Sequence, residues 1–160
     1  MKQTWKIDPD KCSGCRTCEV ACSLFHHGEV NSDKSRIRIV KWEEKGIDVP
    51  VVCQHCEVPV CMENCPTGAL RKGEETECVV YHPEACIGCK LCVLTCPLGG
   101  ITQGLDGAML KCDLCGGEPQ CAAFCITGAI EYLPPARVGE KQRRKAARAL
   151  AHETGSNVDG

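Results

Sequence analysis

The chain is organised around the stretch Cys86-Ile87-Gly88-Cys89-Lys90-Leu91-Cys92-Val93-Leu94-Thr95-Cys96-Pro97, in which the cysteines are spaced C-x2-C-x2-C-x3-C and a proline follows. This spacing holds [4Fe–4S] clusters, whose four iron corners each take one thiolate. Two residues between cysteines let a tight loop reach three corners, with its amides turned toward the sulfur atoms. Gly88 stands where the backbone must pass close to the cluster or take a positive φ. Cys92 and Cys96 are four residues apart, so a helical turn places both on one face.

Three further runs of cysteines repeat this pattern with small changes. The first is C-x2-C-x2-C-x3-C, the second C-x2-C-x4-C-x3-C-P and the fourth C-x2-C-x5-C-x3-C. In chain order the runs are Cys12, Cys15, Cys18 and Cys22, then Cys53, Cys56, Cys61 and Cys65, then Cys86, Cys89, Cys92 and Cys96, then Cys112, Cys115, Cys121 and Cys125. We therefore predict four [4Fe–4S] clusters, with a mixed or smaller cluster count as the alternative. In two-cluster proteins the fourth cysteine of a run ligates the other cluster.

Composition argues against other uses of these cysteines. Cysteine accounts for 17 of 160 residues, whereas aromatic residues make up only 4%, so little material is left for a conventional core. Disulfides fit poorly, because the count is odd and the first residues lack an apolar signal region. Zinc takes separated cysteine pairs and has no use for the third cysteine of runs one and three. Runs two and four alone would leave zinc open.

The charge and hydropathy pattern indicates a soluble protein. The formal charge is −2 and the pI about 6.2 when cysteines are counted as thiols. Four clusters of about −2 each would add roughly −8. No apolar run approaches the roughly 20 residues that span a bilayer. We expect a cytoplasmic protein, with export inside a folded complex as the alternative, and no nucleic-acid partner.

Local patterns predict short strands between the runs. Weak alternation indicates a strand within residues 5–11, and stronger alternation indicates a hairpin-like insertion of strands 36–42 and 47–52. A polar loop is expected at 23–35. Further hairpins are expected at 67–81, with a turn at Glu74-Glu75, and at 99–110, with a turn at Asp106-Gly107. Residues 127–132 repeat the exit of run two, helix formers with a basic face occupy 140–151, and 154–160 have a disordered composition.

Some residues near the runs have a structural explanation that competes with metal ligation. Cys78 lies beside valines, as a buried thiol would. His55, between two cysteines of run two, suits a place beside the cluster or on the surface better than ligation. His26 and His27 are expected to be solvated loop residues.

Two methionines and the basic segment have similar explanations. Met62 and Met109 are expected to pack against clusters rather than to ligate them. The segment 140–151 is either a solvated charged face or a helix that docks on an acidic partner surface. It lacks the aromatic anchors of a membrane-binding helix.

Two blocks resemble a known family. The block Cys53-Gln54-His55-Cys56-Glu57-Val58-Pro59-Val60-Cys61-Met62-Glu63-Asn64-Cys65-Pro66-Thr67-Gly68-Ala69, and Lys111-Cys112-Asp113-Leu114-Cys115 with Pro119 and Cys121, resemble the four-cluster iron–sulfur subunits of molybdenum and tungsten pterin oxidoreductases of the dimethyl-sulfoxide-reductase and formate-dehydrogenase types. Similar polyferredoxins serve hydrogenases and carbon monoxide dehydrogenase. The resemblance covers about residues 5–133. The length and the Arg36-Ile37-Arg38-Ile39 segment are most similar to the small subunit of tungsten aldehyde oxidoreductases, followed by that of tungsten benzoyl-coenzyme-A reductase.

The resemblance implies an α+β fold of tandem bacterial-ferredoxin-like lobes with a C-terminal helical tail. It places residues 1–30 and 105–136 in the first lobe, 53–104 in the second, 31–52 in a hairpin insertion and 137–160 in the tail. It implies the ligand sets Cys12, Cys15, Cys18 and Cys125 (cluster one), Cys22, Cys112, Cys115 and Cys121 (cluster two), Cys53, Cys56, Cys61 and Cys96 (cluster three), and Cys65, Cys86, Cys89 and Cys92 (cluster four). Ser23 and Ile126 stand where the family has proline, which leaves open how well clusters one and two exclude solvent.

The expected function is electron transfer without catalysis, because no acid–base pair, nucleophile or open metal position is present. The resemblance implies a large pterin-binding catalytic subunit as partner and a flavin/NAD- or ferredoxin-linked redox partner. A free ferredoxin-like carrier, the equivalent subunit of another such complex, and a regulatory or zinc-structural module are the alternatives. A cluster exposed at each end of the row would also permit head-to-tail self-assembly.

Overall fold

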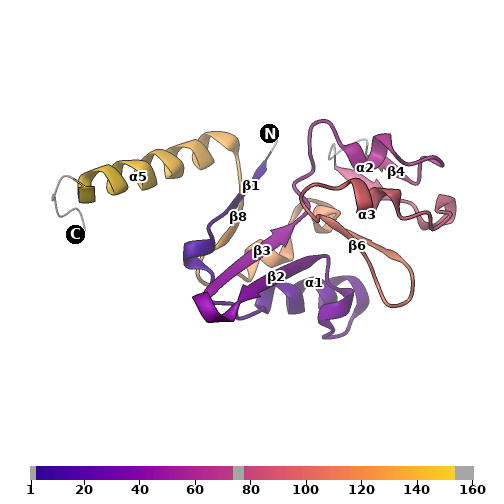
Figure 1. The fold of residues 1–160 in the computed structure, drawn as a ribbon, viewed down its shortest axis with the longest axis horizontal. Helices are drawn as coiled ribbons and strands as arrows, with labels where there is room; N and C mark the ends of the chain where they lie inside the picture. Colours follow the sequence, from indigo (N-terminus) through magenta and orange to yellow (C-terminus); the bar gives the residue numbers. More distant parts are fainter. Residues whose placement is uncertain (1–2, 74–77, 154–160) are drawn as a thin grey trace. The chain divides into compact units, whose positions relative to one another are not determined.

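The computed structural model describes residues 3–73 and 78–153 (Figure 1). Its contacts define a larger unit, Ile7–Glu131, and a smaller unit formed by Met1–Lys6 with Tyr132–Gly160. The strands are β1 (Thr4–Ile7), β2 (Ile37–Trp42), β3 (Ile47–Val52), β4 (Leu70–Lys72), β5 (Val79–Tyr81), β6 (Ile101–Gln103), β7 (Met109–Lys111) and β8 (Ile130–Leu133). The α-helices are α1 (Thr17–His27), α2 (Val60–Glu63), α3 (Leu91–Thr95), α4 (Gln120–Ala123) and α5 (Pro135–Glu153), and short 3-10 turns are η1 (Pro9–Lys11), η2 (Ser32–Lys34), η3 (Glu43–Lys45), η4 (Pro83–Ala85) and η5 (Leu114–Gly117).

The described strands pair two by two, as β1–β8, β2–β3, β4–β5 and β6–β7. In the longest hairpin Ile37 faces Val52 and Trp42 faces Ile47, so the predicted insertion is confirmed. The hairpins β4–β5 and β6–β7 occur where they were expected, with strands of only three residues. The α+β class, built from short hairpins and short helices with a C-terminal helix, is confirmed. The predicted turn at Glu74-Glu75 and the tail 154–160 lie outside the described residues.

The first helix corrects one prediction. Residues 23–27 belong to α1 instead of a polar loop. No proline follows Cys22, so the helix continues until Gly28 ends it with a left-handed conformation. Ser23, at the place of the missing proline, is fully buried; its hydroxyl donates to the Val20 carbonyl (3.1 Å) and accepts from the Asn31 amide (3.1 Å). Serine in place of proline at this position therefore joins α1 to the segment that follows it through two hydrogen bonds.

A buried carboxylate joins α1 to the β2–β3 hairpin. Glu19 is 1% exposed, and its Oε1 accepts a hydrogen bond of 2.7 Å from the Ile39 amide. At the other end of the hairpin, Lys41 pairs with Asp48 at 3.3 Å, and both side chains lie against Gly14 of run one. The insertion therefore covers the loop that holds the first cysteines.

Two pairs of runs are brought together by matching contacts. Helix α1 packs on α4, and the Asp8 amide before run one donates to the Ala129 carbonyl after run four (2.8 Å). Helix α2 packs on α3, and the His82 amide before run three donates to the Ala69 carbonyl after run two (2.8 Å). Runs one and four thus adjoin through the same kind of contact as runs two and three.

The apolar core beside runs two and three is small and lies against cysteines. Leu70, Val79, Ile101 and Met109 are buried together. The thiols Cys61, Cys65, Cys86, Cys92 and Cys96 pack against this group, as does Met62. Both methionines thus pack beside cysteines of runs two and three, and their contact with clusters stays a prediction. The cysteines form part of the surface that covers this core.

The smaller unit consists of chain ends and a long helix. The Trp5 ring packs on Tyr132 with centroids 4.9 Å apart, and β1 pairs with β8. Helix α5 begins at Pro135, earlier than the predicted 140, because proline suits the first turn of a helix. Within the described chain, no helix is long and apolar enough to cross a membrane.

The core beside runs two and three predicts a stability difference between two isoleucines. Ile101→Ala removes a side chain that is 2% exposed, and we expect it to cost about 2–5 kcal/mol of stability. Ile126→Ala, at a position 88% exposed, should change stability by no more than about 0.5 kcal/mol. The measurement is the temperature at which circular dichroism is lost under anaerobic conditions, and equal midpoints for the two variants would contradict this account of the core.

Candidate metal centres

All four cysteine runs share one backbone feature. The residue before the second cysteine has a positive φ in each run: Gly14 (63°), His55 (47°), Gly88 (71°) and Leu114 (58°). This left-handed conformation makes a tight turn between the first two cysteines of each run. The expectation for Gly88 is confirmed. Runs two and four adopt the same turn with non-glycine residues, at a cost in strain that the surrounding contacts must offset.

Backbone amides point at the thiols of the runs. Amide-to-sulfur contacts of 3.2–3.5 Å reach the first cysteine of runs two, three and four and the fourth cysteine of runs one, two and three. The pairs are His55 to Cys53 (3.4 Å), Gly88 to Cys86 (3.4 Å), Leu114 to Cys112 (3.5 Å), Arg36 to Cys22 (3.3 Å), Ala69 to Cys65 (3.2 Å) and Gly100 to Cys96 (3.3 Å). Such bonds stabilise negative charge on sulfur.

The exit of run four shows that Ile126 replaces proline without changing the turn. The Gly128 amide donates to the Cys125 carbonyl (3.2 Å), as the Gly68 amide does to Cys65 (3.3 Å) in run two. Burial tends to raise the pKa of Cys125, but hydrogen bonds from the Ile130 amide and the Thr127 side chain hold it below its usual value. The Ile126 side chain projects into solvent.

Thiols from runs one and four converge on one point. Burial raises the pKa of Cys121 above its ordinary range, and the nearby charges of Cys112, Cys22 and Cys115 raise it further. Burial likewise raises the pKa of Cys112 to about 12. These four cysteines are the predicted ligands of cluster two.

Runs two and three form two more groups. Cys65, Cys86, Cys89 and Cys92 all line one small pocket, together with Tyr81 and Met109. Burial raises the pKa of Cys61, and the neighbouring thiols Cys53 and Cys96 raise it further. The first group is the complete predicted ligand set of cluster four, and the second contains three ligands of cluster three; the remaining one, Cys56, is exposed on the same turn as Cys53.

The thiols of run one lie close together at the start of α1. Burial raises the pKa of Cys18 to about 12, with contributions from Glu19, Cys15 and Cys12. Cys18 also adds to the electrostatic field at Cys121. The structure thus connects three predicted ligands of cluster one and places them beside the cluster-two group; Cys125, the fourth, follows α4 on the partner run.

The chemistry of these groups fits metal clusters. Burial first and then neighbouring thiols raise the pKa of Cys112 and Cys121, so these groups resist ionisation without a compensating positive charge. A cubane iron core supplies that charge, and inward-pointing amides supply the outer hydrogen bonds. Both nitrogens of the His55 ring are buried and have no partner within the described part of the chain, so they too have capacity for a group that fills this space.

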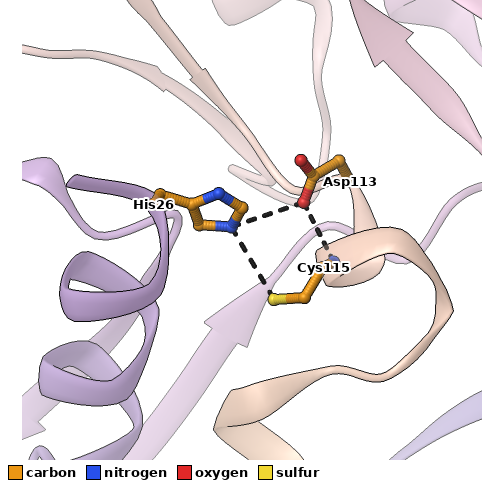
Figure 2. Close-up of side chains that lie close together, drawn as sticks. All are labelled: His26, Asp113 and Cys115. Carbon is orange, nitrogen blue, oxygen red and sulfur yellow. Dashed lines mark hydrogen bonds and ion pairs between the residues drawn. The ribbon is translucent and has the colours of Figure 1, made fainter. Parts of the chain in front are cut away.

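Sequence reasoning missed the polar group around Cys115. His26 Nε2 lies 3.4 Å from Asp113 Oδ1 and 3.7 Å from Cys115 Sγ (Figure 2). Asp113 Oδ2 also lies 2.6 Å from the Arg36 guanidinium. Burial, then the charge of Arg36, lowers the pKa of His26, so the ring is neutral near pH 7. His26 is therefore a half-buried neighbour of run four and not the solvated loop residue expected; His27 is exposed as predicted.

These three side chains do not form a separate metal site. Their donor atoms lie within 4.8 Å of one another. However, Arg36 already neutralises Asp113, holding its carboxyl pKa below the usual value despite burial, and Cys115 belongs to the thiol group of run four. No sequence pattern linked positions 26, 36 and 113, because they come from a helix, the end of a loop and a turn.

Three further residues complete the account of the site. Burial, then the charge of Lys111, lowers the pKa of His55 to about 3, so this ring is neutral and enclosed, not at the surface. Lys111 itself is 3% exposed, and its Nζ contacts Cys53 Sγ at 2.9 Å. Cys78 is buried as expected, although it precedes β5 instead of lying within it.

Comparison with known proteins agrees with the geometry of the thiol groups. Residues 45–133 match the family described as "4Fe-4S dicluster domain", and residues 9–24 match a "4Fe-4S binding domain". The chain belongs to the 4Fe-4S dicluster domain family. The matched segments contain all four cysteine runs, so the [4Fe–4S] clusters predicted as cofactors are confirmed in kind.

The relatives are iron–sulfur subunits. The chain is 48% identical over 129 residues to the "Aliphatic sulfonate oxidoreductase, polyferredoxin-like subunit" of Pyrococcus furiosus, covering 79% of this chain and 73% of that protein. It is 33% identical over 176 residues to the "Probable anaerobic dimethyl sulfoxide reductase chain YnfG" of Escherichia coli, covering 95% and 84%. The chain is thus an iron–sulfur electron-transfer subunit of the dimethyl-sulfoxide-reductase type. A solved "Active site complex BamBC of Benzoyl Coenzyme A reductase" also matches, with 28% identity, coverage of 95% and 96%, and a TM-score of 0.49.

A glycine beside Cys53 provides a test of the site geometry. A Cβ at Gly100 would lie 2.7 Å from the Cys53 Cα, and the Gly100 amide bonds to Cys96. We expect Gly100→Ala to displace both cysteines and to lower the iron content by about one cluster per chain. Gly139→Ala, with no atom within 4 Å of the added carbon, should retain full iron. The measurement is iron and acid-labile sulfide per chain, and equal iron in both variants would contradict the geometry.

Proposed function

We propose that the chain binds four [4Fe–4S] clusters, with two in each of two lobes. Cluster one takes Cys12, Cys15, Cys18 and Cys125. Cluster two takes Cys22, Cys112, Cys115 and Cys121. Cluster three takes Cys53, Cys56, Cys61 and Cys96, and cluster four takes Cys65, Cys86, Cys89 and Cys92. The lobes are residues 1–30 with 105–136, and residues 53–104; residues 31–52 insert between them and 137–160 form the tail.

The main support for this assignment is the convergence of thiols from paired runs. Cys22 of run one shares a group with three cysteines of run four, and Cys65 of run two shares a pocket with three cysteines of run three. Cys56 and Cys125 enter their sets by resemblance and by their place in the runs. Four groups of four use every cysteine except Cys78.

The chain's contribution to electron transfer is to hold the clusters in a row. A bound [4Fe–4S] cluster supplies one-electron redox chemistry. Within each lobe, the third and fourth cysteines of a run serve different clusters from one short helical segment, so a single turn of backbone separates neighbouring centres. Between the proposed lobes, the charges of Cys53 and Cys22 both act on Cys112, which supports a position of clusters two and three beside each other. The order along the row is one, two, three, four.

The proposed complex contains a large catalytic subunit that carries a tungsten or molybdenum pterin, of the aldehyde oxidoreductase type. The small subunit relays electrons between that centre and a flavin/NAD- or ferredoxin-linked partner. Support comes from the relatives, whose names place them in a sulfonate oxidoreductase and a probable dimethyl sulfoxide reductase. An anaerobic, reducing cytoplasm suits a protein that must keep so many cysteines as thiolates.

A free polyferredoxin carrier is the second candidate, and subunits of benzoyl-CoA reductase, formate dehydrogenase or hydrogenase complexes belong to the same class as the first. A carrier needs neither the β2–β3 hairpin nor helix α5. The hairpin is fastened to α1 by Glu19 and covers run one, which favours a fixed place in a complex over free diffusion. A carrier would instead purify as a monomer with salt-dependent, transient partners.

Metal analysis of natively purified, anaerobic protein tests the cofactor assignment. We expect about 16 iron atoms and a similar amount of acid-labile sulfide per chain, since each cluster contains four of each. A value of about four zinc ions with essentially no iron would overturn the proposed function and support a structural zinc module.

The same purification tests the partner. We expect a large pterin-binding subunit containing tungsten or molybdenum to co-elute, and to remain bound at a salt concentration that releases transient electrostatic partners. A monomeric, iron-loaded protein without such a subunit would favour the carrier.

Head-to-tail assembly is a further part of the proposal, because a row of clusters ends in two different faces and contacts between them need not close. Size measurements on the intact complex, with residues 137–160 removed and then restored, test the role of the tail. A smaller assembly without the tail is expected, and an unchanged size would count against its participation.

A further inference from the structure

A buried lysine lies where the two lobes meet. Lys111, the last residue of β7, is 3% exposed. Its Nζ donates to Cys53 Sγ at 2.9 Å and to the Cys112 carbonyl at 3.4 Å. Cys53 belongs to the group assigned to cluster three, and Cys112 to the group assigned to cluster two. One ammonium group therefore contacts a thiol of one group and the backbone of a ligand of the next.

The burial of this cation requires nearby negative charge. A lysine ammonium taken out of water without an anionic partner is strongly unfavourable. Burial raises the pKa of Cys61 and Cys112, and the charge of Lys111 opposes that rise in both, so Lys111 acts on thiols of both groups. The carboxylate nearest along the chain, Asp113, is paired with Arg36. The group at its Nζ that can carry negative charge is the Cys53 sulfur, 2.9 Å away.

A fixed charge at this place changes how readily an electron is held. Reduction adds one negative charge to a cluster, and a cation that touches one of its thiolates stabilises the reduced form more than the oxidised form. Because Lys111 is shielded from water, its field is screened far less than that of a surface lysine. Clusters two and three also repel each other when reduced, and a cation between them reduces that repulsion.

We propose that Lys111 is the residue that sets the electron affinity of the cluster ligated by Cys53 and so controls transfer between the two lobes. It acts as a positioning residue through its charge and its bond to Cys53 and does not contact the substrate of the complex. The inference rests on the cluster assignment of the proposed function. Electron transfer between clusters three and two then depends on Lys111, a residue that ligates neither cluster.

The test is a redox titration of the anaerobically purified, iron-loaded protein followed by electron paramagnetic resonance. In Lys111→Met, one reduction step should shift to lower potential by at least tenfold in the electron-binding equilibrium, about 59 mV for one electron. Lys111→Arg keeps the positive charge, so the potential of that step should stay close to the wild-type value. The matched control is Lys45→Met, which removes the same charge at an exposed position in η3, outside all four cysteine runs, and should leave all steps unchanged.

The outcomes separate this inference from the proposed function. Wild-type protein without iron overturns both. A full complement of iron in Lys111→Met with unchanged potentials overturns the inference alone. If Lys111→Met does not retain its iron, Lys111→Gln carries the test: it is neutral but can still donate a hydrogen bond, so a lowered step supports control by charge, and unchanged potentials overturn it. Loss of the cluster in Met, Gln and Arg variants alike overturns it too, because the lysine would then serve packing only.

Discussion

The structure depends on bringing thiols from distant parts of one chain into small groups and keeping them there. Aromatic residues make up only 4% of the chain, so large apolar side chains contribute little to its core. Its buried apolar group around Ile101 and Met109 is lined by five cysteines. Burial and neighbouring thiols raise the pKa of Cys112 and Cys121, so these sulfur atoms resist ionisation when no metal is bound. Fold and cofactor site are therefore the same part of the molecule.

The loops that hold the cysteines and the hairpins between them could be predicted because residues close together in the sequence determine them. A cysteine spacing constrains a loop of a few residues, and the hairpins between runs have their own alternation and turn residues. The sequence therefore predicted the β2–β3 hairpin and the turn at Gly88. The error at residues 23–27 arose from reading histidine and serine as loop residues, although the absence of proline after Cys22 allowed α1 to continue.

The unpredicted contacts of buried charged residues are long-range. Glu19 reaches an amide of β2, and Lys111 reaches Cys53, 58 residues away in sequence. Most charged residues are exposed, so a charged residue in a sequence is predicted to be exposed. The residues beside it in the sequence do not show which few are buried. Arg36, His26 and Asp113 form one group only because α1, the start of β2 and the turn of run four fold against each other. The groups of thiols could be inferred from cysteine spacing and from the family resemblance. The positions of the charged side chains around them could not, because they depend on how distant segments fold against each other.

The packing of α1 on α4 has a consequence for biosynthesis. Runs two and three are close in sequence, so their thiols can meet soon after they leave the ribosome. The Cys22 thiol instead finds its neighbours Cys112, Cys115 and Cys121 only after some hundred further residues have been made. During that interval the first helix carries unligated sulfur atoms exposed to oxidants and to competing metals. Because run four is made last, the contacts between runs one and four are the last of these contacts to form.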